Sequence, residues 1–281
     1  MRVIRYVSDL IEYISSVKGE TLGLVPTMGC LHQGHLSLVA QARAENQQVA
    51  ATIFVNPRQF NNAEDLDQYP DTLEEDLALL EEVGCDLVFC PLRSEIYPAS
   101  FDATIALGGI THPLEGASRP GHFDGVTTIV SILFNLFQPT TAYFGQKDAQ
   151  QLSVVKKLVR DLRFPVKVIG CPTVRDSGGL ALSSRNTRLS EEQRYEAQAL
   201  YKSLQWAEKQ VLQGEKDTAF LREKMNQAID QEPSAVVDYI AFTDPVSLEE
   251  VDVVEGSVLI SLAVFVGPVR LIDNLLLTPA P

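Results

Sequence analysis

The sequence of 281 residues has few cysteines, few histidines and no long apolar run. Its four cysteines form no Cys-x-x-Cys pair and show no zinc-binding spacing, which excludes a disulfide framework and a structural zinc site; we interpret them as reduced thiols in or near the core. The longest apolar runs, such as Val258–Val266, are far too short to span a bilayer. No internal repeat and no low-complexity tract is present, which argues against a solenoid.

Basic residues are also scarce, because 23 Lys and Arg stand against 37 Asp and Glu, for a net charge of −14. A nucleic-acid-binding protein usually presents a basic face to the phosphates, so this acidic balance argues against nucleic acid as a partner. In a chain with this acidic balance, a cluster of positive groups would indicate a site for an anionic ligand. Asp9 and Glu12 follow soon after the first residue, which argues against a signal peptide. We therefore expect a cytoplasmic protein without a membrane partner.

The first part of the chain alternates short β-rich runs with helical patterns. Thr72 and Glu75 predict a capping box, and Leu36, Val39 and Ala40 predict the buried face of the helix that follows the first strand. Alternation of this kind predicts a parallel sheet covered on both faces, with ligands at the carboxyl ends of its strands. The predicted strands are 21–27, 49–55, 86–90, 141–145 and 166–170, and the predicted helices are 34–46, 72–84, 125–137 and 149–162.

The pattern changes after Cys171, so we place a domain boundary between residues 173 and 174. A loop leads to a long helix whose start is marked by Ser190 and Gln193 as a second capping box. One further helix and three strands with short connections follow. The sequence therefore predicts a parallel-sheet α/β domain at 1–173 and a smaller α+β domain at 174–281.

Two of the four histidines, His32 and His35, lie three residues apart where the predicted strand 21–27 passes into a helix. The first turn of a helix has unpaired N–H groups and a positive dipole end, so it attracts phosphate. Gly29 and Gly34 let the backbone approach a ligand closely. The H-x-G-H spacing should place both imidazoles on one side of the turn, where they can stabilise charge on a phosphorus under attack. A lone histidine more often caps or packs, but the pair at this junction favours a phosphate site.

Several segments resemble one family, in that family's order. The stretch PTMGCLHQGHLSLV resembles the H-x-G-H signature of the nucleotidyltransferase superfamily and, more closely, that of the pantothenate synthetase (pantoate–β-alanine ligase) family. The further matching segments are FVNPRQF, DLDQYPDTLEEDL, DLVFCP, EIYP, LEGASRPGHFDGV, YFGQKDAQQL, GLALSSRN and RLIDN. Together they span nearly the whole chain.

The resemblance implies a ligase that joins pantoate to β-alanine with ATP as a substrate, through a pantoyl-adenylate intermediate, and releases AMP and pyrophosphate. It implies a Rossmann-like nucleotidyltransferase domain at 1–173, which binds ATP and pantoate, and a C-terminal lid domain at 174–281. Mg²⁺ should bridge the phosphates, and the family is commonly a homodimer. The carboxylate of pantoate is ionised at neutral pH, so its attack on the α-phosphorus needs no general base, and catalysis rests on positioning and charge neutralisation.

The resemblance also assigns catalytic roles. His35 matches the proton donor and His32 its phosphate-contacting companion, while Lys147 can neutralise phosphate charge as a point cation. Gln59 and Gln151 match pantoate contacts. The second phosphate loop corresponds to Ser183, Ser184 and Arg185. Asn56 is expected beside Gln59 in the substrate site. The residues expected to bind ATP are Pro26, Thr27, Met28, Gly29, Cys30, Leu31, His32, Gln33, Gly34, His35, Gly145, Gln146, Lys147, Asp148, Val174, Leu182, Ser183, Ser184 and Arg185.

Other assignments stay open. Glu75 and Asp76 could hold Mg²⁺ directly or through water, although Glu75 also has the predicted capping role. Asp148 could bond the ribose or cap the next helix. Arg119 and His122 belong to the shared RPGHF segment, and His122 is as consistent with a structural role as with a functional one.

The chain departs from the family pattern at Gln146, Ala149 and Gly178, where Glu, an aromatic residue and Asp are usual. Neither Gln146 nor Ala149 removes a group that the chemistry requires, and Gly178 should make its loop more mobile. Two other functions fit the motifs in part. Another nucleotidyltransferase would retain the nucleotide in its product, and a catalytically silent nucleotide-binding protein would form no AMP. The acidic charge disfavours a tRNA synthetase.

Overall fold

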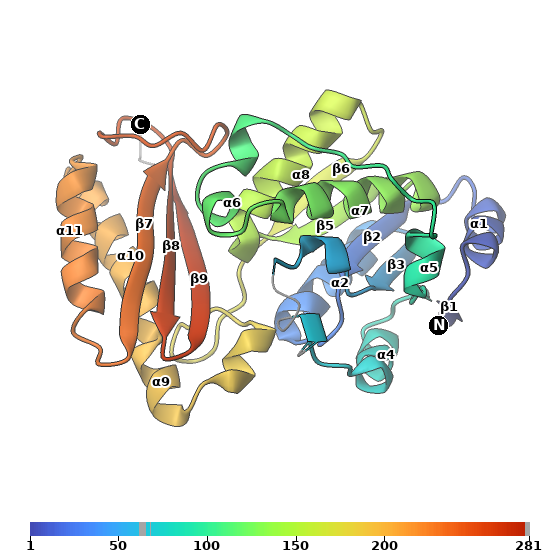
Figure 1. The fold of residues 1–281 in the computed structure, drawn as a ribbon, viewed down its shortest axis with the longest axis horizontal. Coiled ribbons are helices and arrows are strands. Elements are labelled where there is room, and N and C mark those ends of the chain that lie inside the picture. Colours follow the sequence, from blue (N-terminus) through green and yellow to red (C-terminus); the bar gives the residue numbers. More distant parts are fainter. Residues whose placement is uncertain (62–65, 68, 279–281) are drawn as a thin grey trace. The chain divides into compact units, whose positions relative to one another are not determined.

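The computed structural model describes residues 1–61, 66–67 and 69–278 and groups into two compact units (Figure 1). The first comprises Met1–Gln146 and Val154–Pro172, and the second comprises Lys147–Ser153 and the residues from Thr173 onward. Asp65 and Gln68 of the family-like segment DLDQYPDTLEEDL lie outside the described residues. None of the helices in the described part of the chain is long and apolar enough to cross a membrane.

The first unit is built on a six-stranded parallel sheet with the order β1-β4-β3-β2-β5-β6. The chain steps from β2 through β3 to β4 in one direction, and places β5 and β6 on the other side of β2. The order therefore reverses between β2 and β5, and ligands of open α/β sheets bind outside the carboxyl ends at such a switch point. The strands are β1 (Arg2–Ile4), β2 (Leu22–Thr27), β3 (Gln48–Ile53), β4 (Leu87–Phe89), β5 (Thr141–Gly145) and β6 (Lys167–Cys171).

Helices cover both faces of this sheet. On one face, α2 (Gln33–Glu45) and α4 (Leu73–Glu82) share a buried cluster with apolar residues of β2, β3 and β4. On the other, α7 (His122–Phe137) brings Phe137 edge-on against Phe89, and it packs against α1 (Val7–Ser16). The strands of this unit are also connected by η1 (Pro57–Gln59), α5 (Arg93–Ile96), η2 (Gly109–Thr111), α6 (Glu115–Ser118), η3 (Gln146–Asp148) and α8 (Ala149–Leu162). Parts of η3 and α8 belong to the second unit.

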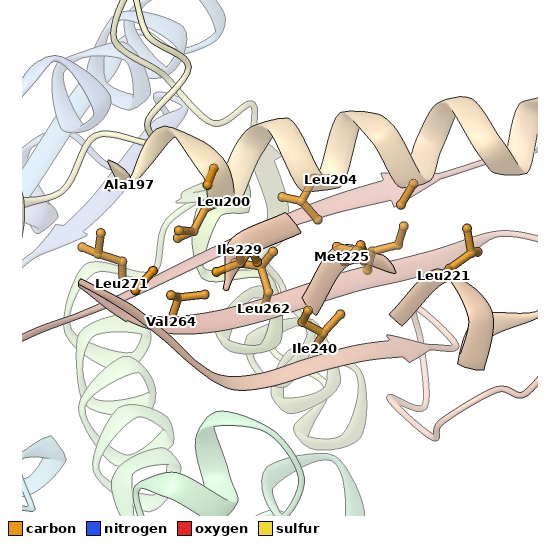
Figure 2. Close-up of a cluster of buried hydrophobic side chains, with 14 of the residues drawn as sticks. Ala197, Leu200, Leu204, Leu221, Met225, Ile229, Ile240, Leu262, Val264 and Leu271 are labelled. Carbon is orange, nitrogen blue, oxygen red and sulfur yellow. The ribbon is translucent and has the colours of Figure 1, made fainter. Parts of the chain in front are cut away.

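The second unit is an antiparallel sheet of β7 (Ala235–Thr243), β8 (Val258–Val266) and β9 (Val269–Leu277) with helices packed on one face. Figure 2 shows Leu200 and Leu204 pointing at Leu262 and Val264 of the sheet. Removal of these side chains from water is the main stabilisation of this unit. Its other elements are η4 (Ser184–Arg188), α9 (Glu191–Glu196), α10 (Gln198–Leu212) and α11 (Thr218–Ile229).

The predicted fold class is confirmed, since a parallel α/β sheet is accompanied by a smaller α+β unit. The capping box of Ser190 and Gln193 is confirmed as well, although the predicted long helix is divided into α9 and α10 at Ala197. All four cysteines are free, and three of them are buried. The division of roles between 1–173 and 174–281 stays a prediction.

Two local predictions were wrong. The helix α2 buries Leu38, Val39 and Ala42, whereas Ala40 is exposed, because the sheet lies against a face rotated from the predicted one. Thr72 and Glu75 form no capping box, since the Thr72 hydroxyl donates to Asp76 Oδ2 instead and Glu75 is exposed. The sequence analysis also missed β1 and α1, whose burial is confined to a few positions such as Leu10 and Tyr13.

Candidate functional site

The loop that follows β2 is held in place by the buried carboxylate of Asp76, a residue of α4. Asp76 is 2% exposed, and its two oxygens accept the backbone N–H groups of Cys30 at 2.8 Å and Leu31 at 2.7 Å. Thr72 donates to the same carboxylate at 3.1 Å. These charge-assisted bonds fix the loop at the carboxyl end of β2, which is the switch point of the sheet.

Gly29 is required by the path of this loop. Its φ of +86° lies in the left-handed region, and a Cβ atom there would stand 2.9 Å from Asp76 Oδ2 and 3.1 Å from a methyl group of Ile53. Cys30 follows with φ +52°, a conformation that an L side chain seldom adopts. Burial, with a smaller contribution from the negative charge of Asp76, raises the pKa of the Cys30 thiol, so Cys30 is neutral near pH 7.

The two histidines of the H-x-G-H motif cap α2 reciprocally. His32 is the N-cap residue, and its Nδ1 accepts the Gly34 N–H at 3.1 Å, while the Nδ1 of His35 accepts the His32 N–H at 3.3 Å. The rings lie with centroids 4.1 Å apart, so the prediction that both imidazoles share one side of the turn is confirmed. Because each Nδ1 accepts a hydrogen bond, the proton of each neutral ring resides on Nε2, which is then a donor.

A second part of the site follows β3. Asn56 is 1% exposed; its Nδ2 donates to Gln59 Oε1 and to the Gly125 carbonyl, both at 3.0 Å, and its Oδ1 accepts the Tyr97 hydroxyl at 2.8 Å. Gln59 Nε2 lies 3.0 Å from the sulfur of Met28, in the loop that follows β2. Asn56 is therefore a buried support of Gln59, and the structure brings Gln59 beside the predicted ATP-binding loop.

Two residues of the RPGHF segment contact the backbone carbonyl of Gln59. His122 Nδ1 lies 2.8 Å from the Gln59 carbonyl oxygen, and Arg119 donates to the same oxygen at 3.1 Å. Arg119 also reaches His122 Nε2 at 3.3 Å, and because a guanidinium only donates, the Nδ1 of His122 must carry the proton. His122 is 6% exposed. Sequence reasoning left this segment without a role, since nothing local shows that it meets a residue 63 positions earlier.

Of the segment after β5, Lys147–Ser153 belongs to the second unit. The side chain of Lys147 is 18% exposed and its Nζ lies 3.8 Å from Asp148 Oδ1. Its backbone carbonyl accepts Nδ2 of Asn274, on β9, at 2.7 Å. Gln151, the second predicted pantoate contact, lies one turn further along α8 and is half-buried.

The predicted second phosphate loop lies at the end of a hairpin in the second unit, and residues 174–185 together are called the serine turn. Leu182 N–H donates to the Val174 carbonyl at 2.9 Å, which closes the hairpin 174–182, and the Ser183 hydroxyl then accepts the Arg185 N–H at 3.3 Å to start η4. Ser184 and Arg185 lie on the first positions of η4. At its base, Arg175 makes a two-pronged ion pair with Asp273 at 2.6 and 2.9 Å.

Glu75 and Asp76, the predicted magnesium ligands, differ in their surroundings. Glu75 is exposed, whereas Asp76 is buried and its oxygens already accept the bonds from Cys30, Leu31 and Thr72. Within residues 1–61, 66–67 and 69–278, no group of three or more His, Cys, Asp or Glu side chains could hold a metal ion. The carboxylate of Asp76 shapes the loop that carries His32, and its role as a magnesium ligand stays a prediction.

The fold and the turn between β2 and α2 together define a class of protein. The strand order of the parallel sheet reverses at β2, and the H-x-G-H motif lies in the turn that leads from β2 into α2. This is the architecture of the H-x-G-H nucleotidyltransferases. Residues 2–276 match the family described as Pantoate-beta-alanine ligase. The chain belongs to the pantoate–β-alanine ligase family, and its enzyme class is that of the ligases.

Known relatives cover almost the whole chain. Pantothenate synthetase from Herpetosiphon aurantiacus is 53% identical over 257 residues, which is 91% of this chain and 93% of the relative. The crystal structure of pantothenate synthetase from Thermus thermophilus matches with a TM-score of 0.93 at 46% identity, covering 98% of this chain and 99% of that one. Pantoate-beta-alanine ligase from Francisella tularensis, complexed with beta-gamma ATP and beta-alanine, matches with a TM-score of 0.81 at 36% identity, covering 98% and 97%.

Proposed function

We propose that the protein condenses pantoate with β-alanine at the expense of ATP, giving pantothenate, AMP and pyrophosphate. The observation that carries the proposal is the reciprocal cap of His32 and His35 at the switch point of the sheet, which presents two imidazole donors where a parallel sheet binds anions. The ligase from Francisella tularensis, whose crystal contains beta-gamma ATP and beta-alanine, supports both substrates.

In the first step a carboxylate oxygen of pantoate attacks the α-phosphorus of ATP, and pyrophosphate leaves. No base is needed, because the carboxylate is ionised near pH 7. The amides of Cys30 and Leu31 are engaged by Asp76 and that of Gly34 by His32, so the Nε2–H groups of His32 and His35 are the donors that meet the phosphate oxygens. They would stabilise the charge that develops on the phosphate as the bond to pyrophosphate breaks.

In the second step the neutral amine of β-alanine attacks the acyl carbon of pantoyl adenylate, an amide forms, AMP leaves with the electron pair of the acyl–oxygen bond, and the amine nitrogen releases one proton to solvent. The adenylate is a mixed anhydride, so the site must keep water away from it. Gln59 and Gln151 hold pantoate in this proposal, because amides both donate to and accept from hydroxyl and carboxylate groups. Asn56 supports Gln59 from behind and need not touch substrate.

The charge on the triphosphate is met by groups of the second unit. Lys147 supplies a point cation, and Ser183, Ser184 and Arg185 supply donors directly after the hairpin that Val174 and Leu182 close. The remaining members of the nucleotide set are Pro26, Thr27, Met28, Gly29, Gln33, Gly145, Gln146 and Asp148. In this proposal the residues 174–281 act as a lid that brings the turn over the phosphates.

Mg²⁺ would accompany ATP in this proposal and would neutralise part of the phosphate charge, with Glu75 and Asp76 as the carboxylates that the sequence offers it. A cytoplasmic location accords with four free thiols. The homodimer rests on the family resemblance alone, and light scattering of the purified protein tests it.

The decisive experiment measures pyrophosphate and AMP separately, with ATP and pantoate, in the presence and absence of β-alanine. We expect pyrophosphate without pantothenate when β-alanine is omitted, and equal amounts of AMP and pantothenate when it is added. A nucleotidyltransferase of another kind would retain the nucleotide in its product and release no AMP. If the protein binds ATP but releases neither pyrophosphate nor AMP, it is only a nucleotide-binding protein, and the proposal is contradicted.

A further inference from the structure

We propose that two neighbouring residues of β9 are positioning residues for the ATP phosphates: Asn274 holds Lys147, and Asp273 holds, through Arg175, the turn that carries Ser183 and Ser184. The inference rests on the proposed phosphate roles of Lys147 and the serine turn. It assigns a function to the late RLIDN segment, which resembles the family but has no role in the chemistry described so far.

Asn274 fixes the backbone from which Lys147 projects. Its Nδ2 donates to the Lys147 carbonyl at 2.7 Å, across 127 positions of sequence. Lys147 lies in the 3₁₀ turn η3 that opens α8, and the segment Lys147–Ser153 groups with the second unit and not with the sheet that precedes it. A lysine side chain has four rotatable bonds, so fixing its backbone narrows the region that Nζ can reach.

Asp273 fixes the base of the serine turn. Its carboxylate is 1% exposed, receives both Nη atoms of Arg175 and also accepts the Asn274 N–H at 2.8 Å. Arg175 donates in addition to the Gly179 carbonyl at 3.1 Å, and its guanidinium lies 3.7 Å from the ring centre of Tyr201 on α10. The guanidinium of Arg175 therefore connects the serine turn both to β9 and to α10.

One strand can serve both phosphate-binding segments because successive side chains of a strand point to opposite faces. Asp273 shares the face of Leu271, which packs in the cluster under α10, and pairs with Leu262 in the ladder. Asn274 points to the other face, toward Lys147. The pair of residues thus places the lysine and the serine turn on one rigid frame, so that the two phosphate-binding segments keep a fixed spacing within the unit.

The test of the Asn274 contact compares Asn274→Ala and the isosteric Asn274→Asp with the control Asn226→Ala, an exposed asparagine of α11. We expect both Asn274 variants to raise the KM for ATP roughly three- to tenfold, the effect of losing one hydrogen bond, while the KM for pantoate stays within about twofold. The control and the wild type should agree. An Asn274→Asp variant with the wild-type KM for ATP overturns this half of the inference.

A double-mutant cycle shows whether Asn274 acts through Lys147. In the Lys147→Ala background, Asn274→Ala should cause no further loss of ATP use, because the side chain that it positions is absent. Additive losses overturn the inference. Lys147→Ala with unchanged ATP use would instead contradict the proposed role of Lys147, so failure of the proposed function and failure of this inference give different results.

Arg175→Lys tests the Asp273 contact, because it keeps the charge and loses the two-pronged geometry. We expect the KM for ATP to rise by roughly threefold or more, with Arg222→Lys, at an exposed ion pair of the same unit, as the control. If Arg175→Lys fails to fold, Tyr201→Leu, which loosens the guanidinium without removing a charge, is measured in the same way. An unchanged KM for ATP in the folded variant contradicts this half.

Discussion

At the scale of single residues, the two histidines have a structural task in the fold, and the proposed mechanism gives them a chemical one. Their Nδ1 atoms cap α2 through the N–H groups of Gly34 and His32, and the same bonds place the proton of a neutral ring on Nε2. A substitution at His35 therefore removes a cap as well as an imidazole, and a kinetic effect of alanine alone would not separate the two.

His35→Gln separates them, because glutamine is a favoured N3 residue of capping boxes and can keep the bond to the His32 N–H. We expect His35→Ala and His35→Gln both to lower the rate of pyrophosphate release from ATP and pantoate by at least ~10²-fold, the effect of losing one transition-state donor. Only His35→Ala should also lower the thermal midpoint. The exposed His112→Gln is the control. Near-wild-type adenylation by His35→Gln would remove the imidazole from the mechanism.

At the scale of elements, the proposed pantoate site depends on how closely η1 approaches α7. A Cβ atom on Gly125 would lie 2.3 Å from the Arg58 carbonyl oxygen and 2.7 Å from the Gln59 nitrogen, so only glycine fits at this crossing. The contact is reinforced by the bond from Asn56 to the Gly125 carbonyl. The position of Gln59 is therefore set by packing of backbone on backbone.

Gly125→Ala should push η1 away from α7 and displace Gln59. We expect the KM for pantoate to rise at least about tenfold, since displacements of about 1 Å can have large kinetic effects, and the free energy of unfolding to fall by about 1–3 kcal/mol from overpacking. Initial rates and urea unfolding measure the two. Gly256→Ala, where a Cβ atom meets nothing within 4 Å, is the control. A pantoate KM unchanged in Gly125→Ala would contradict the role of this crossing.

At the scale of the whole molecule, buried thiols make stability sensitive to alkali. Burial raises the pKa of Cys85, Cys90 and Cys171 to about 11 in each case, from an ordinary value of 9.0. Between these values the unfolded chain has lost protons that the folded chain keeps. The contribution of each thiol is therefore complete below the unfolded pKa and is lost as the pH rises toward the folded one.

The free energy of unfolding should accordingly fall as the pH is raised from about 8 to about 10.5, and Cys171→Ala should make that fall shallower. Guanidinium unfolding under reducing conditions at several pH values measures the slope. Cys30→Ala is the comparison, because the Cys30 thiol is only partly buried and its pKa is less raised. A slope that Cys171→Ala leaves unchanged would show that the thiol does not contribute.

Local sequence was enough to predict the alternation of strands and helices, the H-x-G-H corner and the family, because periodicity, capping residues and short motifs are encoded by near neighbours. Only the folded chain shows that Asp76 supports the loop that carries His32, that His122 contacts the Gln59 carbonyl, and that Asn274 contacts the Lys147 carbonyl. These partners are separated by 46, 63 and 127 positions. Contacts at such separations depend on which elements the fold brings side by side, and no local pattern specifies them.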